Sequence, residues 1–366
     1  MRLLGINLEN FRNLDSLSLE FGSDRVFFLG ANGQGKTNLL EAIGICSNLR
    51  SFRGSSPESM VMDGQTQSRI FAKFLDDDGQ LVEVMINFGR KGGKEVEIDG
   101  ESVKKLGDLL GKFPMVCLSS RDFRLVREGP SDRRKWMDLI LSSTNSNYLS
   151  ALQNYYRSMR ERNALLKKQS GDSEILAFEY TLAASAQFLH LQRSQLFPLL
   201  NQSYDHAYAA LSGHQESASL SYSPDCSFSD VDDWLKMYSE ERQRDRLLGT
   251  TRKGPHRDDF NLLLDKRDAR HFASEGQQKG VVLALRVAEF SFLREKNRTM
   301  PILLADDVLG ELDSFRRSNF RKLLHPSAQT FATGTSYPSL KEVETWETFR
   351  VKSARFSPQD KGEVNG

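Results

Sequence analysis

Residues 30–37 read Gly-Ala-Asn-Gly-Gln-Gly-Lys-Thr and match the phosphate-loop pattern Gly-x-x-x-x-Gly-Lys-[Ser/Thr] at every fixed position. An apolar, β-prone segment precedes the loop at residues 25–29, and a good helix start follows it at residues 38–43. Strand, glycine-rich turn and helix form the context in which this pattern binds a nucleotide. The sequence therefore predicts a nucleotide site at this turn.

The residue types of the loop explain how it can hold phosphates. Glycines let the backbone curl so that successive N–H groups face one anion, and the positive end of the following helix adds to the attraction. Lys36 can reach the β- and γ-phosphates, and the Thr37 hydroxyl can ligate Mg²⁺. The residues that we expect to contact the nucleotide are Gly30, Ala31, Asn32, Gly33, Gln34, Gly35, Lys36 and Thr37.

A second motif, Ile-Leu-Leu-Ala-Asp-Asp at residues 302–307, is typical of a buried strand that ends in carboxylates. In α/β sheets, ligands bind at the carboxyl ends of the strands. We expect Asp306 to hold Mg²⁺, directly or through water, and Asp307 to polarise an attacking water. Alone, the pair could equally be an N-cap ahead of a helix, but the phosphate loop in the same chain favours the magnesium role.

A third motif, Ser-Glu-Gly-Gln-Gln at residues 274–278, precedes a helix expected from Lys279. A serine and a glycine at a helix N-terminus can bind an anion, although such helix starts are common. The expected nucleotide contacts here are Ser274, Gly276 and Gln277.

At 366 residues the chain is long enough for two domains or one large bilobed domain. Its formal net charge of +1 provides no global basic field, so a nucleic-acid site would have to be a local patch. Three scattered cysteines are typical of reduced thiols in a cytosolic protein. With no signal-peptide pattern and no apolar run of membrane-spanning length, we expect a cytoplasmic protein without membrane contact.

The order of the expected elements indicates an α/β unit interrupted by helices. Alternating apolar residues between 70 and 98 predict an antiparallel meander, a short helix follows at 103–110, and apolar spacing after Ser120 predicts long helices. Ser131 is the expected N-cap of the first long helix, and Pro198 is expected to interrupt a later one. The expected segments are a discontinuous lobe I at residues 1–120 and 250–356, a helical lobe II at 121–249 and a polar tail at 357–366.

The order of motifs resembles the ABC-type ATPase head: phosphate loop, helical insert, Ser-x-Gly-Gln, Asp-Asp strand, then Glu-Leu-Asp at residues 311–313. The resemblance implies an α/β head with a mixed sheet and an antiparallel β meander around the phosphate loop, plus an inserted helical lobe. It implies ATP and Mg²⁺ as cofactors, with Lys36 and Asp307 as catalytic residues. In that class two heads face each other, and the phosphate loop of one and the Ser-x-Gly-Gln of the other enclose each ATP.

Further motifs narrow the resemblance, and Gly-Pro-His-Arg-Asp-Asp at residues 254–259 is the most specific of them. Other matching stretches are Leu-Glu-Asn-Phe-Arg-Asn at 8–13, Leu-Val at 125–126, Gly-Pro at 129–130, Arg-Arg at 133–134 and Arg-Asn-Ala-Leu-Leu-Lys at 162–167. Together they resemble the RecF family of bacterial DNA replication and repair proteins over nearly the whole chain. The resemblance implies a weak ATPase that forms a homodimer on ATP and binds single- and double-stranded DNA at gaps and junctions. It also implies cooperation with RecR and RecO, which helps RecA to load.

The chain departs from the family pattern at three places. Ser-Ser-Arg-Asp at residues 119–122 replaces the usual Ser-Pro-Glu-Asp, near where other ABC heads place their Q-loop. Gly310 replaces the usual serine before Glu-Leu-Asp. Thr-Gly-Thr at 333–335 replaces Thr-Ala-Thr, near where other ABC heads carry a switch histidine, so we assign no catalytic histidine.

Three alternatives fit the sequence less well. The soluble ATPase subunit of an ABC transporter normally has a catalytic glutamate where this chain has Asp307, a Leu-Ser-Gly-Gly-Gln signature and a much shorter helical lobe. An SMC-type protein needs hundreds of residues of heptads between its motifs. A nucleoside kinase would leave residues 274–278 unexplained.

Basic residues of the helical lobe are candidates for DNA contacts, although solvated helix faces paired with acids such as Glu161 are the more common explanation for any single one of them. These candidates are Arg133, Arg134, Lys135, Arg157, Arg160, Arg162, Lys167 and Lys168. Arg12 follows the first strand and is expected near the nucleotide. The roles of Arg252, Lys253, His256 and Arg257 stay open between structure and nucleotide contact.

Overall fold

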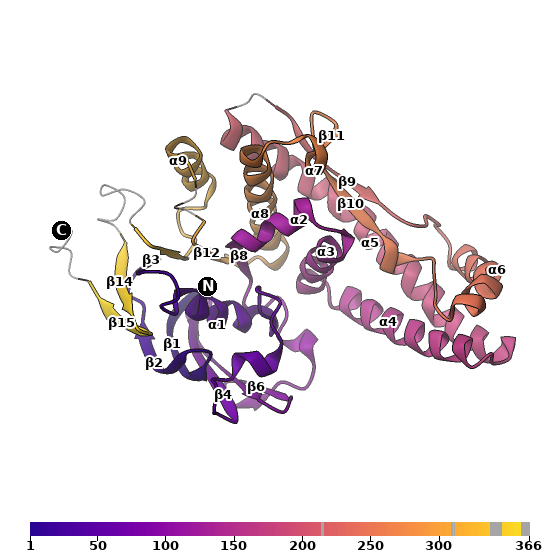
Figure 1. Cartoon of the computed structure of the whole chain (residues 1–366), viewed down its shortest axis with the longest axis horizontal. Helices are drawn as coiled ribbons and strands as arrows, with labels where there is room; N and C mark the ends of the chain where they lie inside the picture. The colour runs from indigo at the N-terminus through magenta and orange to yellow at the C-terminus, as the bar shows by residue number, and fades with distance from the viewer. Residues whose placement is uncertain (214–215, 309, 311, 337–345, 360–366) are drawn as a thin grey trace. The chain divides into compact units, whose positions relative to one another are not determined.

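The computed structural model describes residues 1–213, 216–308, 310, 312–336 and 346–359. The chain divides into two compact units: unit 1 comprises Met1–Asp122 and Glu289–Gly366, and unit 2 comprises Phe123–Ala288. Strands from distant parts of the sequence, β1 (Arg2–Phe11, indigo in Figure 1) and β14 (Glu347–Lys352, yellow), both belong to unit 1.

The first sheet of unit 1 is antiparallel throughout, in the order β2-β1-β4-β5-β6-β7. Its other strands are β2 (Leu14–Glu20), β4 (Gln67–Leu75), β5 (Leu81–Gly89), β6 (Lys94–Ile98) and β7 (Glu101–Ser102). Ile70, Ala72 and Phe74 of β4 are fully buried on one face, which confirms the predicted meander. The expected helix at 103–110 is wrong, since only a 3₁₀ turn forms, at Leu106–Asp108.

The second sheet of unit 1 is mixed, in the order β15-β14-β3-β13-β12-β8, and only β15 is antiparallel to its neighbour. Its other strands are β3 (Arg25–Leu29), β8 (Met115–Ser119), β12 (Ile302–Asp306), β13 (Thr330–Gly334) and β15 (Arg355–Pro358). Because β3, β13 and β12 are parallel, their carboxyl ends meet at one edge. At that edge the end of β3, which leads into the phosphate loop, lies two strands away from Asp306 at the end of β12.

Helix α1 (Lys36–Asn48) lies between the two sheets, since it contacts β1 and β4 of the first and β8, β12 and β13 of the second. Its side chains Leu39, Leu40 and Ile43 are fully buried. At Gly44 a Cβ would lie 3.3 Å from both Cys117 Sγ and Leu304 Cδ1, so the missing side chain permits the close approach of helix and sheet. This packing fixes the start of α1, and hence the phosphate loop, on a rigid base.

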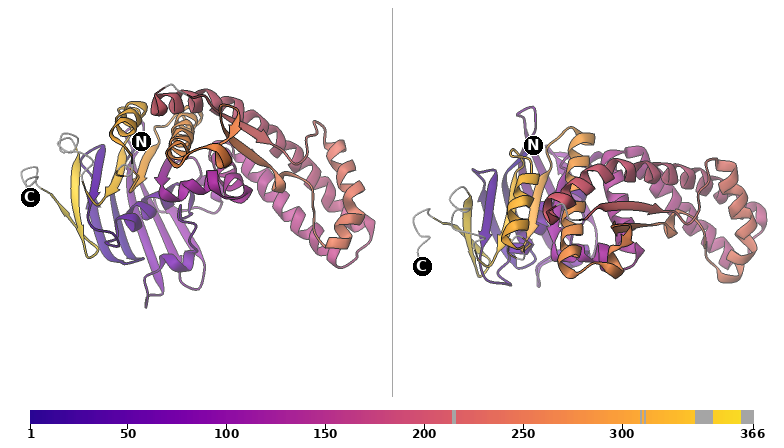
Figure 2. Two further views of the ribbon diagram at one scale, coloured as in Figure 1. Left: turned by 45° about the horizontal axis from the view of Figure 1, so that its top comes forward. Right: turned by 90° about the horizontal axis from the view of Figure 1, so that it is seen from above.

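Unit 2 combines long helices with a three-stranded antiparallel sheet of order β11-β10-β9. Its helices are α2 (Arg124–Arg127), α3 (Pro130–Thr144), α4 (Ser146–Lys167), α5 (Asp172–Ser212), α6 (Val231–Leu248), α7 (Ala269–Phe272) and α8 (Glu275–Asn297), of which α8 continues into unit 1. Its strands are β9 (Ala218–Ser223), β10 (Asp259–Leu264) and β11 (Arg267–Asp268). Helices α4 and α5 lie side by side, and α6 packs against α5 (Figure 2).

Several expectations about these segments need correction. Unit 2 continues to Ala288, beyond the expected end at 249: β10 pairs along its whole length with β9, α7 packs against β10, and the first part of α8 belongs to the same unit. Pro198 does not interrupt α5, since its neighbours Leu196, Phe197 and Leu200 are buried and outweigh the cost of about 3 kcal/mol for a helical proline.

The remaining differences concern the ends of elements. The N-cap of α3 is Gly129, followed by Pro130 at the first helical position, rather than Ser131. β14 and β15 were not expected, and β15 reaches into the segment predicted as a polar tail, of which residues 360–366 lie outside the described part. Within the described residues, no helix combines the length and apolarity needed to cross a membrane.

Candidate nucleotide site

The phosphate loop connects β3 to α1, and two of its glycines are required by the backbone. Gly35 has φ +103° and caps α1, and a Cβ there would lie 3.1 Å from Leu14 Cδ2. A Cβ on Gly30 would collide with the carbonyl oxygen of Val351 in the neighbouring strand β14. The glycines of the motif therefore allow both the turn and the close approach of a strand that sequence analysis did not foresee.

Lys36 lies under the loop and is almost fully buried. Its Nζ donates to the carbonyl oxygens of Gly30 at 2.5 Å and Ala31 at 3.0 Å. An open pocket of about 330 Å³ adjoins this lysine. Its lining residues are Asn32, Gly33, Gly35, Lys36, Thr37, Asn38, Arg53 and Asp307. The structure thus brings Asp307, from the end of β12, to the same pocket as the loop.

Thr37 and Asp306 meet directly, although 269 positions separate them in the chain. Thr37 Oγ1 donates to Asp306 Oδ1 at 2.8 Å, and Thr333 Oγ1 donates to the same oxygen at 3.0 Å. Burial raises the pKa of the Asp306 carboxyl above its ordinary value, against the lowering effect of the two hydroxyl bonds. The contact arises because β13, which carries Thr333, lies between β3 and β12.

The donor set formed by Thr37 and Asp306 fits magnesium. Both groups offer oxygen ligands, which Mg²⁺ prefers. Their oxygens lie 2.8 Å apart, near enough for both to be ligands of one Mg²⁺. Two protein oxygens and several phosphate or water oxygens form the usual magnesium shell at nucleotide sites.

Asp307 turns away from the line of β12 with φ +56°, a left-handed conformation that aspartate tolerates better than most residues. Its N–H donates to Thr333 Oγ1 at 2.9 Å. Thr333 thereby holds both members of the Asp-Asp motif. Asp313 accepts from Arg316 N at 2.8 Å and caps helix α9 (Ser314–Leu323). Glu311 itself lies outside the described residues.

Of two arginines near the loop, one departs from expectation and the other was not singled out by the sequence. Arg12 points to Glu41 of α1, to which it donates at 3.0 Å and 2.7 Å, rather than to the pocket. Arg53 lines the pocket and donates to Asn38 Oδ1 at 2.8 Å. Arg53 was missed because a single arginine in a loop matches no motif, and only the fold places it beside residues 32–38.

The Ser-x-Gly-Gln motif begins α8, four residues earlier than expected, and belongs to unit 2. Ser274 Oγ accepts from Gln277 N at 3.3 Å, and Gln277 Oε1 accepts from Ser274 N at 2.7 Å. These reciprocal bonds form a capping box. Ser274 is exposed, as a group that binds a ligand must be. Gln277, in contrast, is engaged within its own chain.

The segment at 119–122, which departs from the family pattern, buries its aspartate. Asp122 is buried, and its Oδ2 accepts from Ser119 N at 2.9 Å. The carboxylate that ends the Ser-Ser-Arg-Asp sequence therefore stabilises its own turn.

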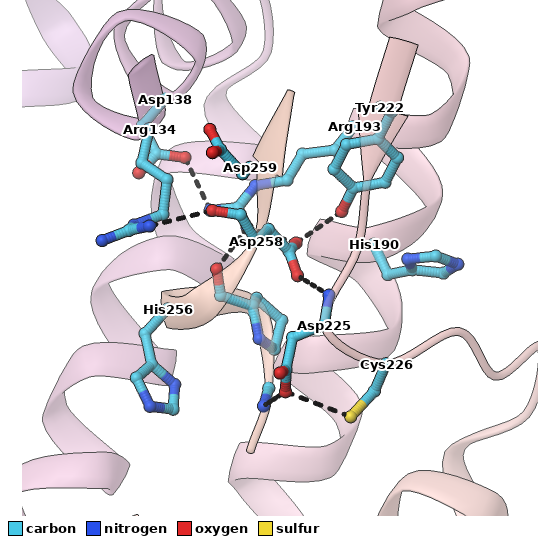
Figure 3. A network of polar contacts seen from close by, with 12 residues as sticks. Arg134, Asp138, His190, Arg193, Tyr222, Asp225, Cys226, His256, Asp258 and Asp259 are labelled. Atoms are coloured by element: carbon cyan, nitrogen blue, oxygen red, sulfur yellow. Dashed lines mark hydrogen bonds and ion pairs between the residues drawn. The ribbon is translucent and has the colours of Figure 1, made fainter. Parts of the chain in front are cut away.

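The Gly-Pro-His-Arg-Asp-Asp motif builds a polar network inside unit 2 (Figure 3). Asp258 is buried and accepts from Arg193 Nη1 at 2.7 Å, from Asp225 N at 3.0 Å and from the Tyr222 hydroxyl. Arg193 also donates to Pro255 O at 2.7 Å and to Asp138 at 2.8 Å. The motif therefore joins α3, α5 and the β9–β10 region.

His256 of this motif is held by hydrogen bonds within unit 2. The sequence had left its role open between structure and nucleotide contact. Its Nδ1 lies 2.7 Å from the Tyr155 hydroxyl, and its Nε2 lies 3.1 Å from Thr251 O. A neutral ring satisfies both contacts, with Nε2–H donating and Nδ1 accepting. Burial lowers the pKa of His256 from 6.5 to about 4, so the ring is neutral at physiological pH.

Two candidate DNA-contacting arginines are buried instead, which corrects the expectation. Arg162 is fully buried and donates to Glu179 at 3.0 Å and Asp245 at 2.7 Å. Arg133 is buried against Asp259 at 2.7 Å and 2.8 Å. Of the other candidates, Arg134 donates to Asp258 O at 2.9 Å and Lys135 to Asp132 at 3.1 Å. The exposed ones are Lys135, Arg157, Arg160, Lys167 and Lys168.

A phosphate loop on a mixed sheet, an Asp-Asp strand at the same edge, an antiparallel meander and a helical insert define an ABC-type ATPase head, as predicted. Residues 2–355 match the RecF/RecN/SMC N terminal domain family. Within it the chain belongs to the RecF family, and the interpretation as an ABC transporter subunit is set aside.

Known proteins of this family are similar over nearly their whole length. The DNA replication and repair protein RecF of Leptospira interrogans serogroup Icterohaemorrhagiae serovar Lai is 36% identical over 93% of this chain and 94% of its own. That of Acaryochloris marina is 33% identical over 92% and 93%. A solved structure of the recombination mediator protein RecF-ATP in the RecFOR pathway superposes with a TM-score of 0.90, at 30% identity, over 98% and 97% of the two chains. An Smc head domain from Pyrococcus furiosus, with a TM-score of 0.57 at 14% identity, shares the fold.

Proposed function

We propose that this chain is an ATP-dependent DNA-binding protein of recombinational repair and replication. It dimerises on ATP at gapped or junction DNA and works in the cytoplasm with RecR and RecO to help load RecA. The observation that carries the proposal is the meeting of Lys36, Thr37 and Asp306 at one sheet edge, beside an open pocket. The relatives support the pathway, since a similar structure is that of RecF-ATP in the RecFOR pathway.

The loop residues bind the nucleotide. Lys36 releases the carbonyl oxygens of Gly30 and Ala31 and turns its ammonium to the β- and γ-phosphates, while the loop N–H groups hold the same oxygens. Thr37 and Asp306 hold Mg²⁺, which neutralises charge on the phosphates. Arg53 adds a second positive charge on the pocket wall.

Asp307 is the residue placed to orient and polarise the attacking water, because it lines the pocket next to Asp306. Its side chain is one methylene shorter than the glutamate usual in this class. The shorter reach favours slow hydrolysis, so that ATP serves as a clamp that holds two copies together for a set time.

The second half of each site comes from another copy of the chain. Ser274 and Gly276, at the N-terminal end of α8, offer a hydroxyl and backbone N–H groups to the γ-phosphate. A ligand that binds both copies at once stabilises the dimer by mass action. Nucleotide binding and dimerisation are therefore one linked equilibrium.

The DNA contact has to be local, since the net charge is only +1. The exposed bases Arg157, Arg160, Lys167 and Lys168 all belong to α4 or its end. At 100° per residue they fall within an arc of roughly 100° on one helix face. Such a stripe can follow phosphates along a strand and makes binding weaken with salt.

Sedimentation velocity with ATP and gapped DNA tests the proposal. The unmodified protein is expected to form dimers only with ATP, and to co-sediment with DNA in that state. Ser274→Arg is expected to keep ATP binding, because unit 1 holds the loop, and to lose dimerisation. A protein that stays monomeric under every condition would overturn the sandwich. Loss of ATP binding itself in Ser274→Arg would instead place Ser274 in the site of its own chain.

A further inference from the structure

Ser274 is held in a defined orientation before any partner arrives. Its Oγ accepts from Gln277 N at 3.3 Å, so one lone pair is used within the helix start. A serine hydroxyl can still donate its proton while it accepts. The capping box therefore leaves the O–H of Ser274 as a donor toward an incoming phosphate.

The amide of Gln277 completes this box and is itself anchored. Gln277 Oε1 accepts from Ser274 N at 2.7 Å, while Gln277 Nε2 donates to Glu216 Oε1. An amide has one oxygen and one NH₂ group, and both are now engaged by the same chain. The Gln277 side chain thus stabilises the capping box, and its bond to Glu216 determines which way its amide faces.

Glu216 also accepts a hydrogen bond from a buried tyrosine. The Tyr208 hydroxyl, on α5, donates to Glu216 Oε2 at 2.6 Å. The Tyr208 ring lies against Gly280 of α8, where an added Cβ would be only 3.2 Å from Cε2. Tyr208, Glu216 and Gln277 therefore form a chain of contacts from the core of unit 2 to Ser274.

We propose that Glu216 is a positioning residue for the Ser274 half of the ATP sandwich, acting through the amide of Gln277. Without this carboxylate the Gln277 amide keeps only its bond to Ser274 N, so the capping box opens more often and the Ser274 hydroxyl is held less firmly in its direction. Preorganised donors bind a phosphate better than mobile ones, because no rotamer freedom is lost at the moment of contact. The expected effect of Glu216 on dimerisation rests on the proposed function. Its expected effect on the order of Ser274 in the monomer depends only on the capping box.

Two substitutions separate hydrogen bonding from charge. Glu216→Ala removes both bonds. Glu216→Gln keeps them, since its oxygen can accept from Gln277 while its NH₂ donates to the Tyr208 hydroxyl. The matched control is Glu240→Ala, which removes an exposed glutamate from α6 in the same unit.

The first measurement is amide hydrogen exchange of residues 273–278 in the nucleotide-free protein. Faster exchange in Glu216→Ala, with normal exchange in Glu216→Gln and the control, is expected because Ser274 N–H loses its acceptor. The second measurement is the dimer dissociation constant in saturating ATP, which is expected to rise about tenfold in Glu216→Ala and to recover in Glu216→Gln. Affinity of the monomer for ATP is expected to stay constant, while the unfolding midpoint of Glu216→Ala is expected to fall slightly because the buried Tyr208 hydroxyl loses an acceptor.

Each outcome decides a different point. Unchanged exchange and unchanged dimerisation in Glu216→Ala would overturn the positioning role while leaving the proposed function intact. A Glu216→Gln variant as defective as Glu216→Ala would also overturn it, because geometry would then not be the cause. If the unmodified protein fails to dimerise with ATP, the proposed function is wrong and the dimerisation measurement on Glu216→Ala is no longer a test. The exchange measurement on the monomer still tests whether Glu216 positions Gln277 and Ser274.

Discussion

Unit 1 and unit 2 each contain a motif rich in charged and polar residues, and the two motifs are used in opposite ways. In unit 1, Lys36, Thr37 and Asp307 line an open pocket. In unit 2, Arg193 and Asp258 are buried and bonded to each other. A buried charge is tolerated only when it is paired and hydrogen-bonded. A motif of charged residues therefore marks a ligand site when its groups face a pocket, and a structural contact when they bond to one another.

Loss of the loop lysine in unit 1 is expected to have the greatest effect on nucleotide binding. Lys36→Met removes the only ammonium on the loop and is expected to weaken ATP binding by at least ~100-fold and to abolish ATP-driven dimerisation. Isothermal titration with ATP and sedimentation measure the two effects. Lys104→Met, at an exposed lysine of the same unit, is the control. Normal ATP-driven dimers of Lys36→Met would show that the loop is not the nucleotide site.

The second prediction addresses the unit 2 side. Asp258→Ala leaves Arg193 buried with Asp138 as its remaining carboxylate partner, and is expected to lower the free energy of unfolding by about 3 kcal/mol. ATP affinity is expected to stay unchanged, because the loop belongs to unit 1. Urea unfolding and ATP titration, with Glu240→Ala as the control, measure both. A loss below about 1 kcal/mol would contradict the structural role of the motif.

The buried histidine of the unit 2 motif is expected to make stability depend modestly on pH. His256 has its pKa lowered from 6.5 to about 4 by burial, so the unfolded chain takes up a proton first as pH falls. Its stabilising contribution is complete above pH 6.5 and is lost as pH falls toward 4. Between pH 7 and pH 5 the loss is expected to be about 2 kcal/mol. His256→Gln, which cannot titrate, is expected to lose about that much less over the same range, and equal losses would contradict this assignment.

Local patterns were sufficient for several elements. The strand, loop and helix at residues 25–48 and the meander of β4, β5 and β6 follow from short-range periodicity, and the structure confirms both. The boundary at 249 was wrong because strand β9, with the short mixed sequence Ala-Ser-Leu-Ser-Tyr-Ser, carries a weak signal of its own. It becomes a strand through its pairing with β10, which no local pattern reveals.

The same limit applies to the candidate site. The types of its residues, a lysine and a threonine in the loop and two aspartates after an apolar strand, could be predicted because each motif is contiguous. The burial of Arg133 and Arg162 could not, since an arginine on a helix has the same pattern whether it faces solvent or a carboxylate from another helix.

The chemistry of the site is readable from the sequence, because the groups expected to bind phosphate and magnesium lie in short segments with fixed backbone geometry. Which charged groups are available for that chemistry depends on the fold. Strand order brings Thr37 to Asp306 across 269 positions, while helix packing closes Arg193 onto Asp258. The physical reason is that burial and pairing depend on contacts between distant segments, and the same side chain is a ligand in one environment and a structural tie in another.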